Sequence, residues 1–403
     1  MKFKDEVLQM HPSWGAAQKI ILKLKENNFE AVLAGGCVRD GFLGRIPKDL
    51  DIATSAEPNQ VEKLFTKTVA VGKAFGVICV IDEQSDIEVA SFRFDGGYED
   101  GRRPVAVKWA TATEDALRRD FTINALFYDP IEKKLTDHVG GVQDIESKSI
   151  RCVGDSRLRF QEDHLRLLRA VRFMAELNFN IEEKTWQSII KHASLIKTVS
   201  RERIRDEVLK ILKSKNEQLG FEKLYESGLL AGIDSELNLM ILQKKQYPRI
   251  LSQSLYDEQI WTQYFQLIQP TKLESQIDLY KLSKDQKKYI QKTLRCISLA
   301  DQIPNWTLGK KLFSYQDAEF KFALQLLSQK KQPQWVSQLM DEVKSRGLNQ
   351  GFPAPIVRGQ DVPAEIPMAD RGCFIDSAYE YQLESQSKDK TQIINAAKVI
   401  ATR

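Results

Sequence analysis

The sequence predicts an α+β protein, in which a compact α/β domain with a small mixed sheet is followed by a long all-α region. Three observations lead to this prediction. Short β-rich runs alternate with helical patterns over roughly the first 150 residues. After Phe160 long helical patterns dominate, and β-branched segments become rare. At 403 residues the chain is too long for one hydrophobic core, so two to four domains are expected.

The elements of the first part follow from periodicity. Residues 15–28 carry apolar residues at helical spacing among charges, which predicts an amphipathic helix. Residues 31–34 form a strand-like apolar run that ends at Gly35-Gly36. We expect further strands and helices after it, the strands at 50–53, 77–81 and 87–92 and the helices at 58–66 and 113–119.

The second part is predicted to be helical throughout. Helical patterns occupy residues 163–177, 182–192, 200–213 and 285–303. Two segments rich in proline and glycine, at 303–306 and 351–367, are expected to interrupt them.

Composition excludes several classes of protein. A hydrophobic fraction of 42% and a charged fraction of 28% describe an ordinary globular protein. No apolar run approaches the ~18 residues that a membrane span needs, and the charged residues 1–14 do not resemble an export signal. Five scattered cysteines and four histidines give no zinc pattern, so we expect reduced thiols and a cytoplasmic protein. The net charge of +4 permits a polyanionic partner without establishing one.

Two aspartates carry the clearest chemical signal. Asp49 and Asp51 lie two residues apart in a strand-like context, so strand alternation places both carboxylates on one face. Two such carboxylates form a natural site for Mg2+, which prefers carboxylate and phosphate oxygens. Glu88, at the start of another predicted strand, is the candidate for a third acid. Upstream, Gly35 and Gly36 can present backbone N–H groups to phosphate oxygens.

Each of these features also has an ordinary structural explanation. A lone Asp-x-Asp pair is usually a solvated strand face, and a lone Gly-Gly pair is usually a turn. The joint pattern favours function, because glycines at a strand end are followed by Val38-Arg39-Asp40 and then by the aspartate pair about ten residues later.

Two further clusters are rich in charge. Arg118 and Arg119 can neutralise a triphosphate through bidentate contacts, although a surface ion cluster is equally consistent with them. Glu162, Asp163 and Arg166 lie at a predicted helix start. There, acids often serve only to stabilise the helix end, and Asp–Arg pairs are common on surfaces.

The motifs together resemble one family. The segment GGCVRDGFLGRIPKDLDIAT, residues 35–54, resembles the first motif of the class II tRNA nucleotidyltransferase and bacterial poly(A) polymerase superfamily. The remaining motifs of that superfamily are resembled, in the same order, by residues 118–126, 137–141, 160–173 (the EDxxR motif) and 200–204. Within the superfamily, the chain is most similar to the bacterial enzymes that add CCA. Beyond about residue 215 the resemblance is weak.

This resemblance implies a function and an architecture. It implies Mg2+-dependent addition of C and A to the 3′ end of tRNA from CTP and ATP, with release of pyrophosphate. It implies a catalytic head at 1–150, a neck at 151–215, a body at 216–335 and a tRNA-binding tail at 336–403.

The resemblance also implies roles for individual residues. It places the acidic catalytic site at Asp49, Asp51 and Glu88, with metal on the two aspartates. It assigns Asp120 to the ribose 2′-OH with Asn124 beside it, and it assigns Asp163 and Arg166, with Glu162, to the base edge. The full set of nucleotide-binding residues that it implies is Gly35, Gly36, Arg39, Arg118, Arg119, Asp120, Asn124, Glu162, Asp163 and Arg166.

Two other features fit the same family. The charged, glycine-rich segment 95–104 corresponds to a flexible loop that the family needs for the final adenosine, although such a segment is also typical of a solvated loop. Lysine clusters recur beyond residue 215, near residues 244, 287, 310 and 330. The ordinary explanation is that these lysines lie on solvated helix faces. The resemblance favours a second one, in which they contact phosphates along tRNA.

Several alternatives stay open at the level of sequence. Poly(A) polymerases carry a basic segment where this chain has residues 71–76, VGKAFG, which looks like the tRNA enzymes. Enzymes that add only CC lack the flexible loop, and an A-adding specialist would share both features. From other classes, the chain could be a catalytically inactive RNA-binding protein or a transferase that acts on a small molecule; the intact carboxylates and the long helical region disfavour these two.

Overall fold

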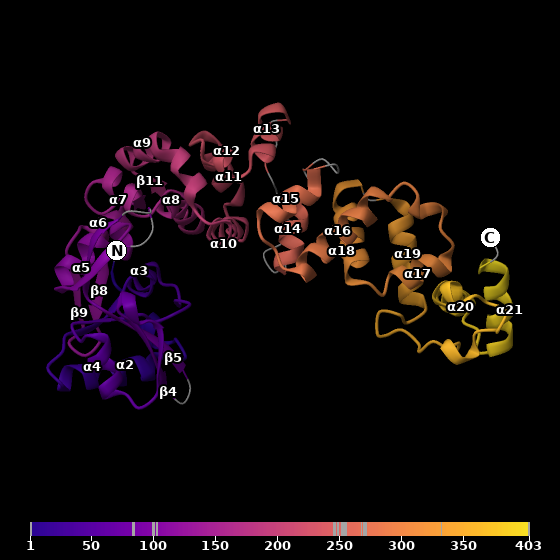
Figure 1. Ribbon diagram of the computed structural model, residues 1–403, viewed down its shortest axis with the longest axis horizontal. Coiled ribbons are helices and arrows are strands. Elements are labelled where there is room, and N and C mark those ends of the chain that lie inside the picture. Colours follow the sequence, from indigo (N-terminus) through magenta and orange to yellow (C-terminus); the bar gives the residue numbers. More distant parts are fainter. Residues whose placement is uncertain are drawn as a thin grey trace. The chain divides into compact units, whose positions relative to one another are not determined.

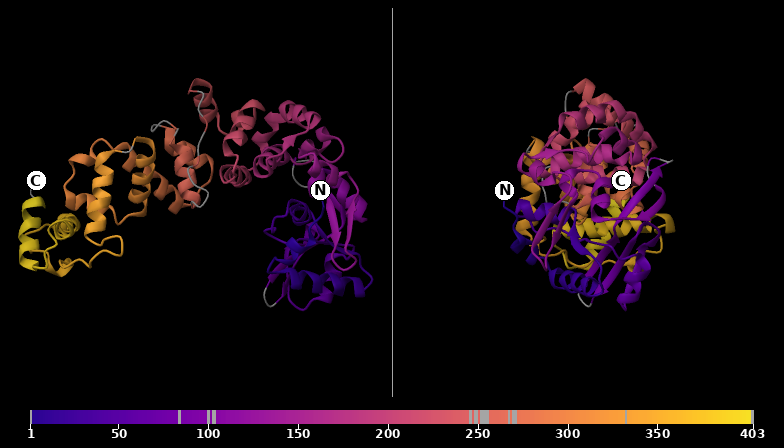
Figure 2. Two further views of the ribbon diagram at one scale, coloured as in Figure 1. Left: turned by 180° about the vertical axis from the view of Figure 1, so that it is seen from behind. Right: turned by 90° about the vertical axis from the view of Figure 1, so that its left-hand side faces the viewer.

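The computed structural model in Figure 1 describes most of the chain, namely residues 2–82, 85–98, 101, 104–244, 247, 250, 256–266, 268, 272–331 and 333–401. The chain divides into two compact units. Unit 1 comprises Met1–Gln253 and Leu267–Lys281, and unit 2 comprises Ser254–Gln266 and Leu282–Arg403. All strands in the described ranges belong to unit 1, and Figure 2 shows them in the indigo and magenta part of the chain. The α+β fold class predicted from the sequence is therefore confirmed.

A seven-stranded mixed sheet organises the first part of unit 1. Its strands lie in the order β3 (Thr68–Gly72), β4 (Val77–Asp82), β5 (Ser85–Ser91), β2 (Ile52–Thr54), β1 (Ala31–Ala34), β8 (Leu126–Asp129) and β9 (Lys134–Asp137). Only the β2–β5 pair is parallel among these neighbours. The central strands β1, β2 and β8 are buried along their whole length, which explains their continuous apolar character.

Helices connect and cover these strands. The helix α2 (Trp14–Glu26) is amphipathic, and its apolar residues Ile20, Ile21 and Leu24 are buried. The helices of this part are α1 (Asp5–Gln9), α2 (Trp14–Glu26), α3 (Gly36–Leu43), α4 (Pro58–Leu64), α5 (Ala112–Arg118) and α6 (Gly141–Glu146), with short 3-10 turns η1 (Lys73–Phe75) and η2 (Thr122–Asn124).

The predicted strands and helices occur within a few residues of their expected positions, with one useful difference. The strand expected at 50–53 begins only at Ile52, so Asp49 and Asp51 precede β2 rather than lie inside it. The backbone is nevertheless extended there, because the Ala34 N–H donates to the Asp51 carbonyl at 2.9 Å.

The glycine-rich segment 95–104 differs from the expected loop. Residues 95–98 belong to strand β6 (Arg93–Tyr98), which pairs antiparallel with β7 (Pro104–Trp109) in a separate two-stranded hairpin. The β-branched, alternating sequence of β7 supplies a partner strand, and glycine backbones can pair as any other residue does. Of the charged residues considered in this segment, Glu99, Asp100, Arg102 and Arg103 lie outside the described residues.

Helices form the rest of unit 1. They are α7 (Ser156–Glu162), α8 (Leu165–Leu177), α9 (Glu183–His192), α10 (Arg201–Leu212), α11 (Glu217–Glu226), α12 (Leu229–Ile233), α13 (Ser235–Lys244) and α15 (Leu273–Leu279), with η3 (Ala193–Thr198) and the two-stranded pair β10 (Ser149–Ile150) and β11 (Asn180–Ile181). The helix predicted from residue 163 instead begins at Leu165, because Asp163 ends α7 in an extended conformation.

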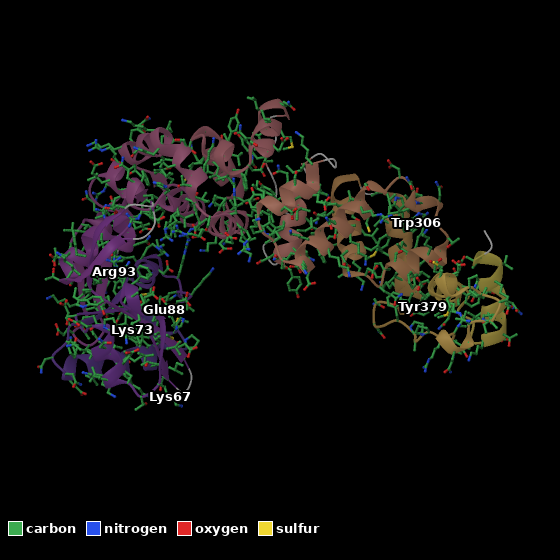
Figure 3. The ribbon with its side chains drawn as sticks, in the orientation of Figure 1. Lys67, Lys73, Glu88, Arg93, Trp306 and Tyr379 are labelled. Atoms are coloured by element: carbon green, nitrogen blue, oxygen red, sulfur yellow. The ribbon has the colours of Figure 1, made fainter. Side chains whose placement is uncertain are left out.

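Unit 2 is helical in its described residues. Its elements are α14 (Asp257–Phe265), α16 (Lys284–Ser298), α17 (Leu308–Ser314), α18 (Ala318–Lys331), α19 (Gln334–Ser345), α20 (Arg371–Ser385) and α21 (Lys390–Ala401), with 3-10 turns η5 (Ile303–Asn305), η6 (Gly359–Asp361) and η7 (Met368–Asp370). Two labelled side chains in Figure 3 mark its interior contacts. Trp306 stacks on Phe320 at 6.2 Å between ring centroids, and the Tyr379 hydroxyl donates to the Pro353 carbonyl. The expected breaks at 303–306 and 351–367 contain only short 3-10 turns and irregular backbone.

No helix within the described ranges combines the length and the apolarity that crossing a membrane requires.

Candidate active site

A polar cleft of about 620 Å3 lies between the sheet of unit 1 and helices α8 and α10. Seven arginines and four aspartates line it, which leaves a surplus of positive charge. Such a surplus suits a polyphosphate, because guanidinium groups bind phosphate oxygens in pairs. The cleft is lined by Gly35, Gly36, Arg39, Asp49, Asp51, Arg118, Arg119, Asp120, Asn124, Asp163, Leu165, Arg166, Arg169, Arg172, Phe173 and Arg203. Eleven of these sixteen residues are among those predicted from the sequence.

The glycine pair marks the point where β1 turns into α3. Gly35 has φ +77°, a conformation that favours glycine, and its N–H donates to the Leu126 carbonyl at 3.0 Å. A Cβ on Gly35 would lie 3.0 Å from the Arg119 guanidinium, so the missing side chain makes room for that arginine. The backbone N–H of Gly35 is therefore used within the fold, while Gly36 opens α3, whose first turn faces the cleft with N–H groups that need partners.

The acidic part of the site is set by strand register. Ile52 of β2 pairs with Val89 of β5 in parallel, so Asp51, just before β2, and Glu88, just before Val89 on β5, are neighbours. All three acids, Asp49, Asp51 and Glu88, are exposed. Only the two aspartates line the cleft, while Glu88 lies beside Asp51 on the neighbouring strand.

This cluster carries unbalanced negative charge. Neighbouring protein atoms partly desolvate the Asp51 carboxylate, and this desolvation, followed by the charges of Glu88 and Asp49, raises the pKa of Asp51 to about 6. The charge of Arg119 opposes the shift. Hard carboxylate oxygens with excess negative charge fit a divalent cation. Among the described residues no three His, Cys, Asp or Glu side chains form a ready-made metal cage, so phosphate or water oxygens would have to complete the coordination.

The arginine pair is held by a buried acid that sequence reasoning did not identify. Asp115 on α5 is almost fully buried and accepts hydrogen bonds from both arginines, from the Arg118 Nε at 2.9 Å and from the Arg119 Nε at 3.0 Å. Burial would raise the pKa of Asp115, but the charges of Arg119 and Arg118 outweigh it and lower the pKa. Asp115 thus fixes both guanidinium groups at the cleft wall. The spacing Asp115, Arg118 and Arg119 (i, i+3, i+4) was a signal for this contact.

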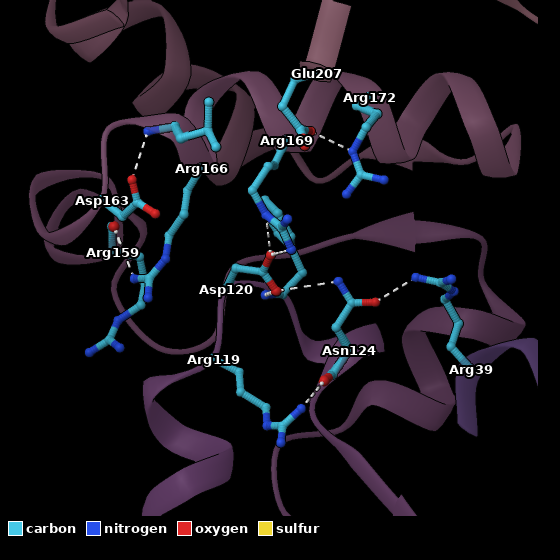
Figure 4. Close-up of polar contacts among 12 residues, drawn as sticks. Arg39, Arg119, Asp120, Asn124, Arg159, Asp163, Arg166, Arg169, Arg172 and Glu207 are labelled. Atoms are coloured by element: carbon cyan, nitrogen blue, oxygen red, sulfur yellow. Dashed lines mark hydrogen bonds and ion pairs between the residues drawn. The ribbon is translucent and has the colours of Figure 1, made fainter. Parts of the chain in front are cut away.

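A connected network surrounds Asp120 in the middle of the cleft (Figure 4). The Arg169 guanidinium donates to Asp120, and the Asn124 amide donates to the same carboxylate at 3.3 Å. Arg39 in turn donates to the Asn124 side-chain oxygen at 2.6 Å. Burial alone would raise the pKa of Asp120, but Arg169 and then Arg166 lower it to about 2. Asp120 is therefore a fixed anion.

The EDxxR residues lie at the junction of two helices rather than at the start of one. Glu162 ends α7 and forms ion pairs with Arg159 at 2.9 Å and Arg166 at 2.5 Å. Glu162 does not line the main cleft; it faces a smaller cavity beside β6. The structure thus places it behind Arg166, where it holds the guanidinium.

Asp163 and Arg166 both line the cleft, and the Arg166 backbone N–H donates to the Asp163 carbonyl at 2.9 Å. The Asp163 carboxylate pairs with Arg203 of α10 at 2.8 Å, and its other oxygen accepts the Leu165 N–H at 3.1 Å, which is a helix-capping contact. Arg166 also donates to the Arg118 carbonyl at 3.1 Å, which links the EDxxR segment to the arginine pair. Asp163 therefore both contacts the start of α8 and faces the cleft.

Sequence reasoning missed five residues that line the cleft, Leu165, Arg169, Arg172, Phe173 and Arg203. The arginines on α8 follow Arg166 at intervals of three, a spacing that places them on one helix face and that the sequence already displayed. Arg172 is held by Glu207 of α10 at 2.5 Å. The contribution of α10 could not be read from spacing, because it depends on how α10 packs against α8.

Known proteins resemble this chain in sequence. The family described as "Poly A polymerase head domain" matches residues 31–151, and the family described as "Probable RNA and SrmB- binding site of polymerase A" matches residues 178–240. A CCA-adding enzyme of Bacillus pumilus is 43% identical over 233 residues, which cover 56% of this chain and 58% of the relative. One of Bacillus licheniformis is 39% identical over 256 residues, which cover 62% and 64%. The matched part thus spans less than two thirds of each relative.

Known structures resemble it over nearly its whole length. A crystal structure of the Bacillus stearothermophilus CCA-adding enzyme in complex with CTP has a TM-score of 0.77 and 28% identity, covering 98% of this chain and 99% of that one. A Thermotoga maritima CCA-adding enzyme complexed with tRNA has a TM-score of 0.64 at 18% identity, which supports the fold alone, covering 99% and 98%.

Proposed function

We propose that this chain, which belongs to the class II nucleotidyltransferase superfamily, adds C and A to the 3′ end of tRNA from CTP and ATP without a nucleic-acid template. The observation that carries the proposal is that Asp49 and Asp51, a wall of arginines, and Asp163 with Arg166 all line one cleft. The similarity to CCA-adding enzymes supports the choice of substrate.

The nucleotide would lie along the cleft with its triphosphate at the arginine wall. Arg118 and Arg119, fixed by Asp115, would bind phosphate oxygens, and the start of α3 at Gly36 would add backbone N–H groups. Asp120 would accept the ribose 2′-OH, since a carboxylate keeps acceptor capacity beyond its bonds to Arg169 and Asn124.

The base would meet Asp163 and Arg166. A carboxylate accepts from the exocyclic amino group that cytosine and adenine share, and a guanidinium donates to a ring nitrogen or a carbonyl oxygen. Uracil and guanine do not offer this arrangement, so their binding would leave buried polar groups unpaired. Arg203 and Glu162 would keep the two reading side chains in place.

The reaction is an in-line attack of the tRNA 3′-oxygen on the α-phosphorus, with pyrophosphate as the leaving group. We propose Mg2+ as the metal that Asp49 and Asp51 hold; when bound, it supplies charge neutralisation for the attacking and leaving oxygens. We propose that Glu88 accepts the proton of the 3′-OH, because Glu88 lies beside Asp51 and is exposed. Catalysis then comes mainly from positioning and from the fixed arginines.

For the chain as a whole we propose a catalytic head at 1–150, a neck at 151–215, a body at 216–335 and a tRNA-binding tail at 336–403, in the cytoplasm. Release of pyrophosphate from CTP, measured with tRNA that lacks its terminal CCA, tests the activity. Release that depends on both tRNA and Mg2+ supports the proposal. Binding of tRNA without any release would instead identify an inactive RNA-binding protein.

A further inference from the structure

A row of four side chains crosses the sheet from the acidic site to its free edge. Val69 of β3 pairs with Cys79 of β4, and Cys79 pairs with Glu88 of β5. Glu88 is next to Asp51 through the parallel pairing of β5 with β2. Partners directly opposite in a sheet point to the same face, so the row runs along one face over about 14 Å, three strand spacings.

The outer part of this face is apolar and exposed. On the edge strand β3, which has no charged residue, Val69 is 48% exposed on this face. The register between β3 and β4 shifts between Val69 and Gly72, and Val71, which lies within that shift, is 60% exposed at the sheet edge. Phe75 follows at 38%, and the Trp109 ring covers Gly76 beside it at 41%. On the other face of the same strands Ile78, Val80 and Val89 are buried beneath α2 and α4.

Basic side chains flank this apolar surface. Lys67 and Lys73 are exposed on either side of β3, where Lys73 forms an ion pair with Glu62 at 2.6 Å, and Arg93 donates to the Phe75 carbonyl. Figure 3 labels Lys67, Lys73, Arg93 and Glu88 in the same part of unit 1. We call the set Val69, Val71, Phe75, Trp109, Lys67 and Lys73 the edge strip.

We propose that the edge strip is the platform for the single-stranded 3′ end of the acceptor RNA, just before the reacting nucleotide. The proposal rests on the proposed function. Aromatic rings among basic side chains suit single-stranded RNA, because every base can stack and every nucleotide carries a phosphate. An exposed apolar surface that is continuous with an active site is also typical of an interaction surface.

The order of the strands explains why the RNA would approach from this side. Counting outward from β2, the strands β1 and β8 lie on one side and the strands β5, β4 and β3 on the other. The cleft residues Gly35 and Asn124 belong to the first side, at the ends of β1 and η2. A nucleotide in the cleft therefore leaves the second side for the RNA, whose 3′-OH would reach Asp51 past Glu88.

The edge of a sheet can also attract another protein strand, and flanking lysines are a common protection against that. If the edge strip bound only a protein strand, substitutions in it would leave the affinity for RNA unchanged. The two explanations therefore separate in an assay that measures RNA binding and nucleotide binding independently.

The test compares Phe75→Ala and Val71→Ser with the full-length protein and with Ile131→Ala. Ile131 is 42% exposed in the turn between β8 and β9, at the opposite edge of the sheet, and serves as the matched control. Steady-state incorporation of CTP is measured with tRNA and CTP varied separately. We expect Phe75→Ala to raise the KM for tRNA by roughly 10-fold, because one base–aromatic contact contributes on the order of 1–3 kcal/mol. Val71→Ser, which removes only an exposed apolar side chain, should raise it in the same direction by a smaller factor. The KM for CTP, kcat and the thermal midpoint should stay within about twofold in all three variants.

A second readout does not depend on turnover. An acceptor-stem RNA carries 2-aminopurine at its penultimate 3′ position, and its fluorescence should fall on binding as the base stacks. Phe75→Ala should remove most of that quenching, and Ile131→Ala should not. Unchanged tRNA KM and unchanged quenching in both strip variants would overturn the proposal. So would variants that only dissociate a dimer in sedimentation, since the strip would then join two copies of the chain. A wild-type protein that incorporates no nucleotide would instead contradict the proposed function.

Discussion

Arg169 donates two hydrogen bonds to one carboxylate oxygen of Asp120, from Nε at 2.8 Å and from Nη2 at 2.6 Å. The two residues lie 49 positions apart, and their pairing connects α8 to the segment between α5 and η2. It keeps Asp120 ionised, with a pKa of about 2, and fixes the carboxylate's orientation in the cleft. The group that we assign to the ribose is therefore held by a residue that lies in the EDxxR segment but that received no role from the sequence.

This pairing predicts an effect on sugar selection. Arg169→Gln should leave Asp120 less well fixed, and discrimination between CTP and its 2′-deoxy analogue should fall by roughly 10-fold or more, since hydrogen bonds to charged groups contribute about 1.5–3 kcal/mol. The ratio of kcat/KM for the two nucleotides measures it. Arg157→Gln, which affects only an exposed pair with Asp155, is the control. An unchanged ratio in Arg169→Gln would show that Asp120 does not read the sugar.

The acidic site predicts loss of chemistry without loss of RNA binding. Asp51→Asn or Asp49→Ala should reduce incorporation of both C and A to background, because each removes a carboxylate that we propose to hold the metal, while the Kd for tRNA changes little. Incorporation of radiolabelled nucleotides and filter binding measure the two quantities. Asp86→Asn, an exposed acid on the same strand as Glu88, should retain activity. Substantial Mg2+-dependent activity in Asp51→Asn would refute the assignment.

Base selection should depend on the residues at the α7–α8 junction. Asp163→Ala or Arg166→Ala should lose discrimination among the four triphosphates by about 1–3 kcal/mol for each lost edge contact. Arg203→Gln should act in the same direction but more weakly, because Arg203 only holds Asp163. Competition between labelled CTP and UTP measures this. If the variants remain selective and lose only thermal stability, Asp163 is simply the cap of α8.

The hairpin predicts a defect confined to the last addition. Replacing 95–104 by a short linker should leave C addition largely intact and stop products at CC. If only Asp163 and Arg166 read the base, the pocket has to change shape to accept ATP after CTP, and we propose that this segment makes the change possible. Gly101→Ala offers a milder version: Gly101 has φ +65°, and a Cβ there would collide with the His164 ring beside Asp163. Gel analysis of the products measures both. Completion of CCA at the normal rate by the linker variant would exclude a switching role.

Much of the fold could be predicted from sequence because the signals are local. The buried strand 31–34 and the amphipathic helix near residue 20 are marked by their own periodicity. The edge strand β3 and the hairpin strand β6 were not predicted. β3 is largely exposed and lacks the polar alternation of a half-buried strand, and β6 contains two glycines.

The residues that line the cleft could be predicted where they belong to one short sequence motif. They could not be predicted where their position depends on how two helices pack. Asp49, Asp51 and the pair Arg118 and Arg119 were found because their neighbours in sequence are also their neighbours in the cleft. Arg203 reaches the cleft, and Glu207 reaches the cleft residue Arg172, only because α10 packs along α8. Glu162 was expected to contact the nucleotide with Asp163, but the break between α7 and α8 turns it toward Arg159 and Arg166.

Product analysis with three tRNA substrates tests the central claim most directly. The substrates end at the discriminator base, at the first C and at CC, and each is incubated with CTP alone, ATP alone or both. With CTP alone, the account predicts that the substrates ending at the discriminator base and at the first C are extended to CC and no further. With ATP alone, only the substrate ending at CC should be extended, by one residue. With both nucleotides, every substrate should end in CCA. If A is added to the CC end but neither of the other two substrates is extended with C, the protein is an A-adding specialist. A product that stops at CC with both nucleotides present would identify a CC-adding one. A long A tail would identify a poly(A) polymerase. Any of these results would contradict the function proposed for this cleft.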